Sequence, residues 1–344
     1  MMHMHHPFLH PPTISSTCEG EGVHSMADHQ QIAHGSGQMR AQSISIQLST
    51  RERCTAGCKF CISRTTPGTE VEDEKLVKLC GLKRLRVGLR FAERTGATHA
   101  ILTGRADPSQ EKAEYLVSVV KECSRYLPLV DMHTNGYLFQ PNLPPSISRE
   151  YLLPDLVNAG LTMITLSIAS HDFEQNRELM LIKKSPAELI KRCRSLGLMV
   201  RASLVINKSG VQDAAGILEY IRVLGNLGVQ MVVIREVWRP ESVGRATQEV
   251  IDWNATNWID IAPLQTAFTE FGMNKEHGVR IGNPLPWGTP VFLVGGIFDE
   301  QSHGVNVTFA RCEEANGGTV MKSIVHKPDG HGYRNWDHNG DILY

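Results

Sequence analysis

Residues 43–61 read Ser-Ile-Ser-Ile-Gln-Leu-Ser-Thr-Arg-Glu-Arg-Cys-Thr-Ala-Gly-Cys-Lys-Phe-Cys. From Ser43 to Ser49 polar and apolar side chains alternate, which is the period of a β-strand. Directly after this run come Cys54, Cys58 and Cys61, separated by three and then two residues in a loop that contains glycine. The stretch therefore predicts a strand whose carboxyl end leads into a loop carrying three thiols.

Beyond this stretch the chain alternates short β-rich runs with segments of helical periodicity up to about residue 240. Helices are predicted over residues 76–89, 113–123 and 185–197, the last with Ser185 and Glu188 as a capping pair and Gly197 as its end. Repeated strand-then-helix units imply parallel strands joined by right-handed crossovers. The sequence thus predicts an α/β fold, a partial (β/α)6 TIM-like barrel with its chemistry at the carboxyl ends of the strands. The six predicted strands are Ser43–Ser49, Thr98–Thr103, Leu127–His133, Thr162–Ile168, Val200–Ile206 and Met231–Arg235.

The three thiols have the spacing of an iron–sulfur site. Three cysteine ligands hold three irons of a [4Fe-4S] cluster and leave the fourth open, whereas closed electron-transfer clusters generally take four cysteines. A structural zinc site would need a fourth Cys or His, and none follows Cys61 at regular spacing. A redox Cys-x-x-Cys pair would leave Cys54 unexplained. We therefore expect Cys54, Cys58 and Cys61 to be metal ligands.

This loop, including Phe60 before its last cysteine, resembles the signature of the radical S-adenosylmethionine superfamily, and the resemblance extends over residues 43 to about 240. It implies that S-adenosylmethionine chelates the open iron through its amino and carboxylate groups. It further implies that an external donor of the flavodoxin or ferredoxin type reduces the cluster, and that the resulting 5'-deoxyadenosyl radical abstracts hydrogen from a substrate. The three cysteines would then be the catalytic residues of an oxidoreductase-like enzyme.

Further segments at the predicted strand ends resemble cofactor-binding loops of that superfamily. Residues 103–108 resemble its amino-group binding loop, with alanine where glycine is usual and aspartate where glutamate is usual. Polar residues closing the third, fourth and fifth strands could bind ribose or methionine groups, although turns and strand ends also favour such residues. The candidate cofactor-binding residues are Phe60, Thr103, Gly104, Arg105, Ala106, Asp107, Asn135, Ser167 and Ser203.

The fifth and sixth predicted strands resemble the molybdenum-cofactor branch of the superfamily, which rearranges GTP. That branch has a second three-cysteine cluster near its carboxyl end, whereas residues 241–344 contain only Cys312. We therefore predict one cluster and do not assign the GTP reaction.

Composition divides the chain into three regions. Residues 1–40 are rich in His, Pro and Ser and are predicted to be a disordered tail. Residues 41–240 are predicted to form the barrel. Residues 241–344 are predicted to be a helical linker and a small β-rich appendage, which either caps the substrate site or completes the core.

Bulk properties limit the partners. A net charge of -1 gives no basic field for nucleic acid, and the longest apolar run, Val291 to Phe298, is too short to cross a membrane. No secretory or transit signal is recognised, and the five cysteines outside the loop are scattered singly, so a reducing cytoplasmic location is expected.

The predicted rim has an excess of positively charged and hydrogen-bond-donating side chains. They suggest an anionic small-molecule or peptide substrate, unless they pair with Glu52, Asp107 or Glu236. Two other function classes stay open, a glycyl-radical activating enzyme acting on a partner protein and a non-catalytic iron–sulfur binding module. The rim residues are Arg51, Arg53, Arg105, His133, His171, Arg235 and Arg239.

Overall fold

Six adjacent parallel strands form the middle of the sheet, in the order β1-β2-β3-β4-β5-β6. The computed structural model describes residues 39–51, 53–64, 77–239, 248–286, 288–295, 304–311, 320–336 and 341–344. All six predicted strands are confirmed, and the predicted tail, apart from Met39 and Arg40, lies outside the described residues. The strands are β1 Arg40–Gln47, β2 His99–Thr103, β3 Leu129–Thr134, β4 Met163–Ser167, β5 Met199–Ile206 and β6 Met231–Glu236.

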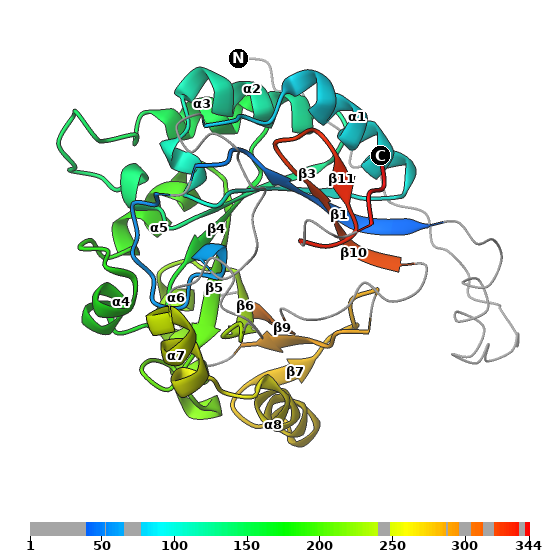
Figure 1. The fold of residues 1–344 in the computed structure, drawn as a ribbon. Helices are drawn as coiled ribbons and strands as arrows, with labels where there is room; N and C mark the ends of the chain where they lie inside the picture. The colour runs from blue at the N-terminus through cyan, green and yellow to red at the C-terminus, as the bar shows by residue number, and fades with distance from the viewer. Residues whose placement is uncertain are drawn as a thin grey trace, which may run out of the picture. The chain divides into compact units, whose positions relative to one another are not determined.

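Helices follow these strands and lie on the outer side of the curved sheet (Figure 1). The α-helices are α1 Leu82–Arg94, α2 Ala113–Cys123, α3 Leu152–Ala159, α4 Phe173–Met180, α5 Ala187–Ser195, α6 Ala214–Asn226, α7 Gln248–Asn257 and α8 Ile261–Asn274. Short 3-10 helices are η2 Ile62–Arg64, η3 Pro108–Gln110 and η4 Tyr137–Phe139. None of the described helices has the length and apolar character needed to span a membrane.

Two local predictions about helices need correction. The helix expected from residue 76 begins at Leu82, because Leu79 is extended and bridges Ser49; residue 76 lies outside the described residues. At the start of α5 the Ser185 hydroxyl accepts a bond from the Ala187 N–H at 3.3 Å. Glu188, however, accepts from Lys191 instead of reaching back to the cap. Gly197 ends the helix with φ +81°, as predicted.

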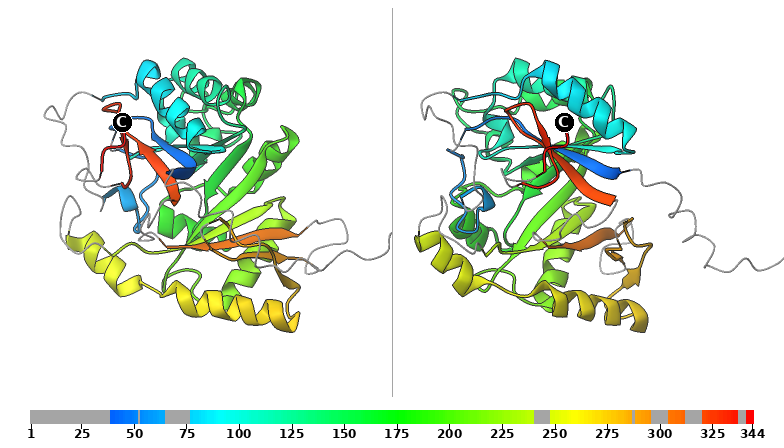
Figure 2. Two further views of the ribbon diagram at one scale, coloured as in Figure 1. Left: turned by 90° about the vertical axis from the view of Figure 1, so that its right-hand side faces the viewer. Right: turned by 45° about the vertical axis from the view of Figure 1, so that its right-hand side comes forward.

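The C-terminal strands join the same sheet at both ends. They are β7 Val279–Ile281, β8 Val291–Val294, β9 Val305–Ala310, β10 Val320–His326 and β11 Gly332–Tyr333. Strand β9 runs parallel to β6 and β10 runs parallel to β1, while β7, β8 and β11 are antiparallel additions. The two terminal strands, β11 and β7, are not paired with each other, so the barrel is open (Figure 2). That this region caps a substrate stays a prediction.

The two faces of the sheet differ in polarity because side chains alternate along each strand. Ile44, Leu102, Val200 and their equivalents point outward and are buried against the helices. On the opposite, inner face, the strand register aligns Thr165 with Arg201. The inner face is therefore lined by polar side chains, and the carboxyl ends of the parallel strands open onto one rim.

Candidate functional site

The cysteine loop leaves β1 and returns to it, so that its base is closed. The Thr50 N–H donates to the Lys78 carbonyl at 3.0 Å, and the Cys80 N–H donates to the Leu48 carbonyl at 2.8 Å. The Tyr115 hydroxyl, from α2, lies 3.0 Å from the Leu48 carbonyl and 2.9 Å from that of Cys80. These contacts fix both ends of the loop at the carboxyl end of β1.

The middle of the loop is attached to the end of α4. The N–H groups of Gly57 and Lys59 donate to the carbonyls of Met180 and Leu179, at 2.9 and 3.2 Å. Those carbonyls are among the last of a helix and would otherwise have no intrahelical partner. A small apolar cluster lies beneath this contact, and Phe60 packs against Trp253 of α7 with ring centroids 6.3 Å apart.

None of the three loop cysteines forms a disulfide with another described cysteine. Cys54 is exposed, whereas Cys58 and Cys61 are half-buried. Desolvation raises the pKa of the Cys54 thiol even though the residue retains contact with solvent, and the Ala56 N–H and Asn135 amide partly oppose this rise. No group of three or more His, Cys, Asp or Glu side chains in the described part of the chain is close enough to hold a metal ion as it stands. Three thiols within one anchored loop nevertheless fit the ligand set of a cluster with one open iron.

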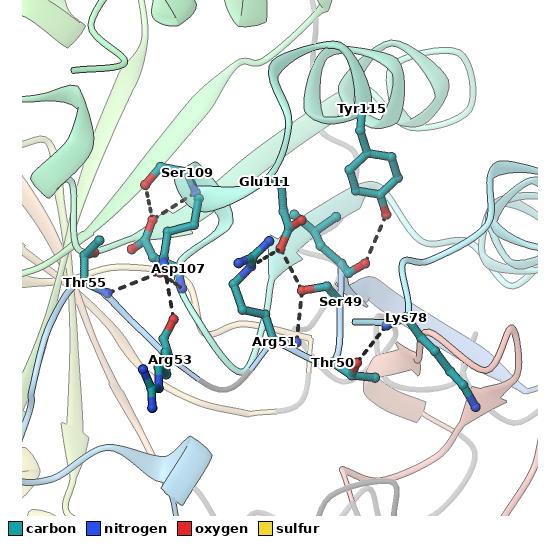
Figure 3. Close-up of polar contacts among 12 residues, drawn as sticks. Ser49, Thr50, Arg51, Arg53, Thr55, Lys78, Asp107, Ser109, Glu111 and Tyr115 are labelled. Atoms are coloured by element: carbon teal, nitrogen blue, oxygen red, sulfur yellow. Dashed lines mark hydrogen bonds and ion pairs between the residues drawn. The ribbon is translucent and has the colours of Figure 1, made fainter. Parts of the chain in front are cut away.

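Two side-chain amides flank Cys54. The Asn135 Nδ2 lies 3.4 Å from the Cys54 Sγ and 3.0 Å from the Thr55 Oγ1. The Gln110 Oε1 accepts from the Thr55 N–H at 3.2 Å, and its Nε2 donates to the Arg53 carbonyl at 3.1 Å. The backbone on both sides of Cys54 is thus bonded to η3 (Figure 3).

Asp107 is buried and has several donors of its own. Its Oδ1 accepts from the Ser109 N–H at 2.9 Å and from the Thr134 hydroxyl at 2.7 Å, and its Oδ2 accepts from the Asn135 N–H at 2.5 Å. The carboxylate therefore ties the end of β2 to the end of β3. That Asp107 also binds a cofactor amino group stays a prediction.

Glu111 organises a second contact beside the loop base. Its Oε1 accepts from the Ser49 hydroxyl at 2.7 Å and forms an ion pair with the Arg51 Nε at 3.4 Å (Figure 3). Arg51 is thus paired with Glu111, an acid that the sequence-based alternatives did not include, and Glu52 lies outside the described residues. Arg239, another predicted rim residue, lies over the Trp258 ring at 3.7 Å.

A polar cluster occupies the inner face of strands β3, β4 and β5. Asp131 is fully buried and binds the Arg201 guanidinium, the Thr165 hydroxyl at 2.9 Å and the His133 Nε2 at 3.0 Å. Burial alone would raise the pKa of Asp131, but Arg201 and His133 hold it well below its usual value. Burial lowers the pKa of His133, and the nearby Arg201 and Arg235 lower it further, whereas Asp131 opposes the shift. The cluster therefore holds the His133 imidazole, with its lowered pKa, 3.0 Å from the Arg201 guanidinium.

The remaining candidate residues lie at the ends of neighbouring strands. Ser167 and Ser203 are register partners on β4 and β5, both half-buried on the inner face. Thr103 ends β2, and a Cβ at Gly104 would come within 2.9 Å of the Ala106 carbonyl, so the turn after Thr103 requires glycine. The structure thus brings the predicted residues to one rim, while their binding roles stay predictions.

Four residues of this region were missed from the sequence: Gln110, Glu111, Asp131 and Arg201. Asp131 and Arg201 lie inside predicted strands, and a charge in an otherwise apolar strand indicates a polar lining on one face. No comparable signal marks Gln110 and Glu111, which lie just after the 103–108 loop.

The other described cysteines, Cys80, Cys123 and Cys193, are buried in the core. Burial raises the pKa of Cys80 and of Cys193 to about 12, and that of Cys123 also rises. They remain protonated and are not suited to ligate a metal. Cys312 lies outside the described residues.

Solved structures include proteins whose fold is similar to that of this chain. No protein-family model and no curated protein matches the sequence. SuiB from Streptococcus suis bound to S-adenosylmethionine has a TM-score of 0.55 at 13% identity, over 89% of this chain and 63% of SuiB. The same protein bound to its precursor peptide SuiA has a TM-score of 0.53 at 14% identity, over 96% of this chain and 70% of SuiB. The fold is similar to that of SuiB. At this level of identity the likeness concerns the fold, and the chain spans about two thirds of SuiB.

Proposed function

We propose that this chain is a radical S-adenosylmethionine enzyme with a single [4Fe-4S] cluster on Cys54, Cys58 and Cys61. The observation that carries the proposal is the arrangement of thiols. Three thiols share one anchored loop at the carboxyl end of β1, and the other described cysteines are buried in the core. SuiB, of similar fold, is bound to S-adenosylmethionine.

A bound, reduced cluster would supply the electron for reductive cleavage of S-adenosylmethionine, the chemistry by which a hydrogen atom would be taken from the substrate. The residues of the chain are proposed to bind and orient S-adenosylmethionine. Backbone groups of residues 103–107 lie at the rim to accept the cofactor ammonium, and Ser167 and Ser203 offer hydroxyls from β4 and β5. Phe60, packed on Trp253, shields one side of the loop from water.

An anionic substrate is proposed for the inner face of the sheet. Arg201 and Arg235 both lie close enough to His133 to lower its pKa, and Arg201 is held by Asp131. Guanidinium groups suit carboxylates and phosphates because they donate in a planar fork. The substrate is a small molecule or a peptide; the complex of SuiB with its precursor peptide gives weight to the peptide.

The division of labour follows the sequence regions. Residues 41–240 are proposed to hold both cofactors and residues 241–344 to cover the substrate. The exposure of Cys54 favours electron entry from a flavodoxin- or ferredoxin-type donor at the surface of the cysteine loop. The reduced state of all described cysteines agrees with a reducing, cytoplasmic setting.

The proposal is tested by anaerobic reconstitution with iron and sulfide, reduction with dithionite and addition of S-adenosylmethionine. We expect 5'-deoxyadenosine and methionine from the native chain and none from Cys58→Ala. Cys193→Ala is the matched control, because it removes a buried thiol far along the chain from the loop.

The outcome separates the alternatives. A well-loaded cluster that binds S-adenosylmethionine without cleaving it would favour the binding-module class. Cleavage that requires a copurifying protein which then carries a glycyl radical would favour the activating-enzyme class.

A further inference from the structure

We infer that Gln110 and Asn135 form an amide clamp around Cys54, in which Gln110 is a positioning residue for the loop and Asn135 is a donor to the ligand sulfur. The inference rests on the proposed function, because it concerns the same cluster. Neither residue is a ligand; the clamp acts on the geometry and the reduction potential of the site.

Gln110, a residue of η3, makes three hydrogen bonds, two of them to the cysteine loop and one to the N-cap of its own helix. Its Oε1 accepts from two backbone N–H groups, those of Thr55 and Asp107, both at 3.2 Å. Its Nε2 donates to the Arg53 carbonyl at 3.1 Å. Because Arg53 and Thr55 flank Cys54 directly, the amide fixes the backbone that carries the first thiol.

An amide is required for this pattern. The site needs an acceptor for two N–H groups and a donor for one carbonyl, and an uncharged amide offers an oxygen with two lone pairs beside an NH2 donor. A glutamate would keep the acceptors but lose the donor and add negative charge beside a thiolate. Leucine would lose all three bonds while filling a similar volume.

Asn135 approaches the sulfur itself. Its Nδ2 lies 3.4 Å from the Cys54 Sγ, its Oδ1 accepts from the Tyr137 N–H at 2.9 Å, and its own N–H donates to Asp107. The hydrogen bond from the Tyr137 N–H orients the Asn135 Oδ1 away from Cys54. The Nδ2 of the amide is therefore turned toward the Cys54 thiol. Hydrogen bonds to cluster sulfurs stabilise the reduced, more negative state and raise the reduction potential.

The two amides therefore predict two different defects. Gln110→Leu is expected to bind the cluster less firmly, with severalfold faster iron loss to a chelator. Asn135→Ala is expected to keep its iron but to show a midpoint potential shifted to more negative values. Iron and sulfide content, chelator kinetics and a redox titration followed by electron paramagnetic resonance measure these effects without relying on catalysis.

Gln230→Leu is the matched control. The Gln230 Oε1 accepts from the Val200 N–H at 3.2 Å and from Arg194 at 2.6 Å, so it is a comparable amide bridge at the amino end of β5. We expect this variant to retain iron and potential like the native chain. If Gln110→Leu fails to fold by circular dichroism, Gln110→Glu, which keeps both acceptor bonds, replaces it and is expected to lose iron faster than Gln230→Leu.

The possible results are distinguishable. Iron loss from the Gln110 variants no faster than from Gln230→Leu overturns the positioning role, and an unchanged potential in Asn135→Ala overturns the donor role. If the native chain takes up no cluster at all, the proposed function is wrong. This result differs from the two results that would overturn the amide clamp.

Discussion

At the scale of single residues, His326 at the end of β10 is an imidazole enclosed in the core. It is fully buried, its Nδ1 lies 3.0 Å from the Tyr344 hydroxyl, and its Nε2 has no hydrogen-bond partner in the described structure. Burial lowers its pKa to about 4. Protonation of this ring must therefore oppose folding.

We predict that His326 makes the fold less stable in mild acid. Between about pH 4 and 6.5 the unfolded chain binds the proton more readily, so the stabilisation from the neutral ring is complete above pH 6.5 and is lost as pH falls toward 4. The free energy of unfolding, measured with urea, should fall from pH 7 to pH 5 in both proteins. The decrease in the native chain should exceed that in His326→Gln by roughly 2 kcal/mol. Equal losses in the two proteins would contradict this assignment.

Gly88 provides a second prediction at this scale, because it makes room for a tyrosine. A Cβ there would lie 2.4 Å from the Tyr344 hydroxyl. Although alanine is the better helix former, Gly88→Ala should destabilise the fold by about 1–3 kcal/mol through overpacking. Thermal unfolding of a double-mutant cycle with Tyr344→Phe checks the cause, since removing the hydroxyl should recover part of the loss; purely additive effects would exclude the clash.

At the scale of elements, the Asp131 cluster joins strands that are not neighbours. Asp131 on β3 reaches Arg201 on β5 across Thr165 of β4. Only 17% of the Arg201 side-chain surface is exposed and none of that of Asp131, so each charge is compensated mainly by the other and not by water. The ion pair thus fixes the relative positions of three strands from the inner side.

We predict that Asp131→Asn destabilises the fold by about 3–5 kcal/mol, because it leaves a mostly buried guanidinium without its counter-charge. Replacing both partners, Asp131→Asn with Arg201→Met, should recover much of this loss. Glu219→Gln, which breaks the exposed pair with Arg222, should change stability by less than about 1 kcal/mol. Chemical denaturation measures all three, and a double variant no more stable than Asp131→Asn would argue against the pairing.

The sequence predicted elements well where their signal is local. The alternation of residues 43–49 and the apolar periodicity of residues 113–123 correspond to β1 and α2. The Gln110 bonds to the cysteine loop could not be predicted, because they join residues more than 50 positions apart and depend on how η3 is oriented. The Asp131–Arg201 ion pair also joins residues far apart in the chain. It could not be predicted because it depends on the register of three strands.

At the scale of the whole described unit, the C-terminal strands protect the sheet. Strand β10 covers the free edge of β1 and β9 covers that of β6, although β1 and β10 are about 280 residues apart in the chain. No local pattern marks such pairings. Unpaired edges of this kind are sites of aggregation.

We therefore predict that a chain ending at Arg239 does not behave as an independent barrel. Without β9 and β10, strands β1 and β6 become edges, and size-exclusion chromatography should show aggregates where the full chain gives a single species. A monomeric, cooperatively unfolding fragment would instead establish residues 41–240 as an autonomous domain.

The Leu48–Cys80 and Thr50–Lys78 hydrogen bonds close the base of the cysteine loop, and this affects the loop-closure entropy of cluster binding. The protein has already closed the large ring, so a cluster held by the three cysteines as proposed would close only the two small rings between successive cysteines. Loop-closure entropy changes by about 0.6 kcal/mol for each doubling of length. We therefore expect iron affinity to be nearly independent of the length of the returning segment after Cys61, so that insertions or deletions there would leave the proposed ligand set intact.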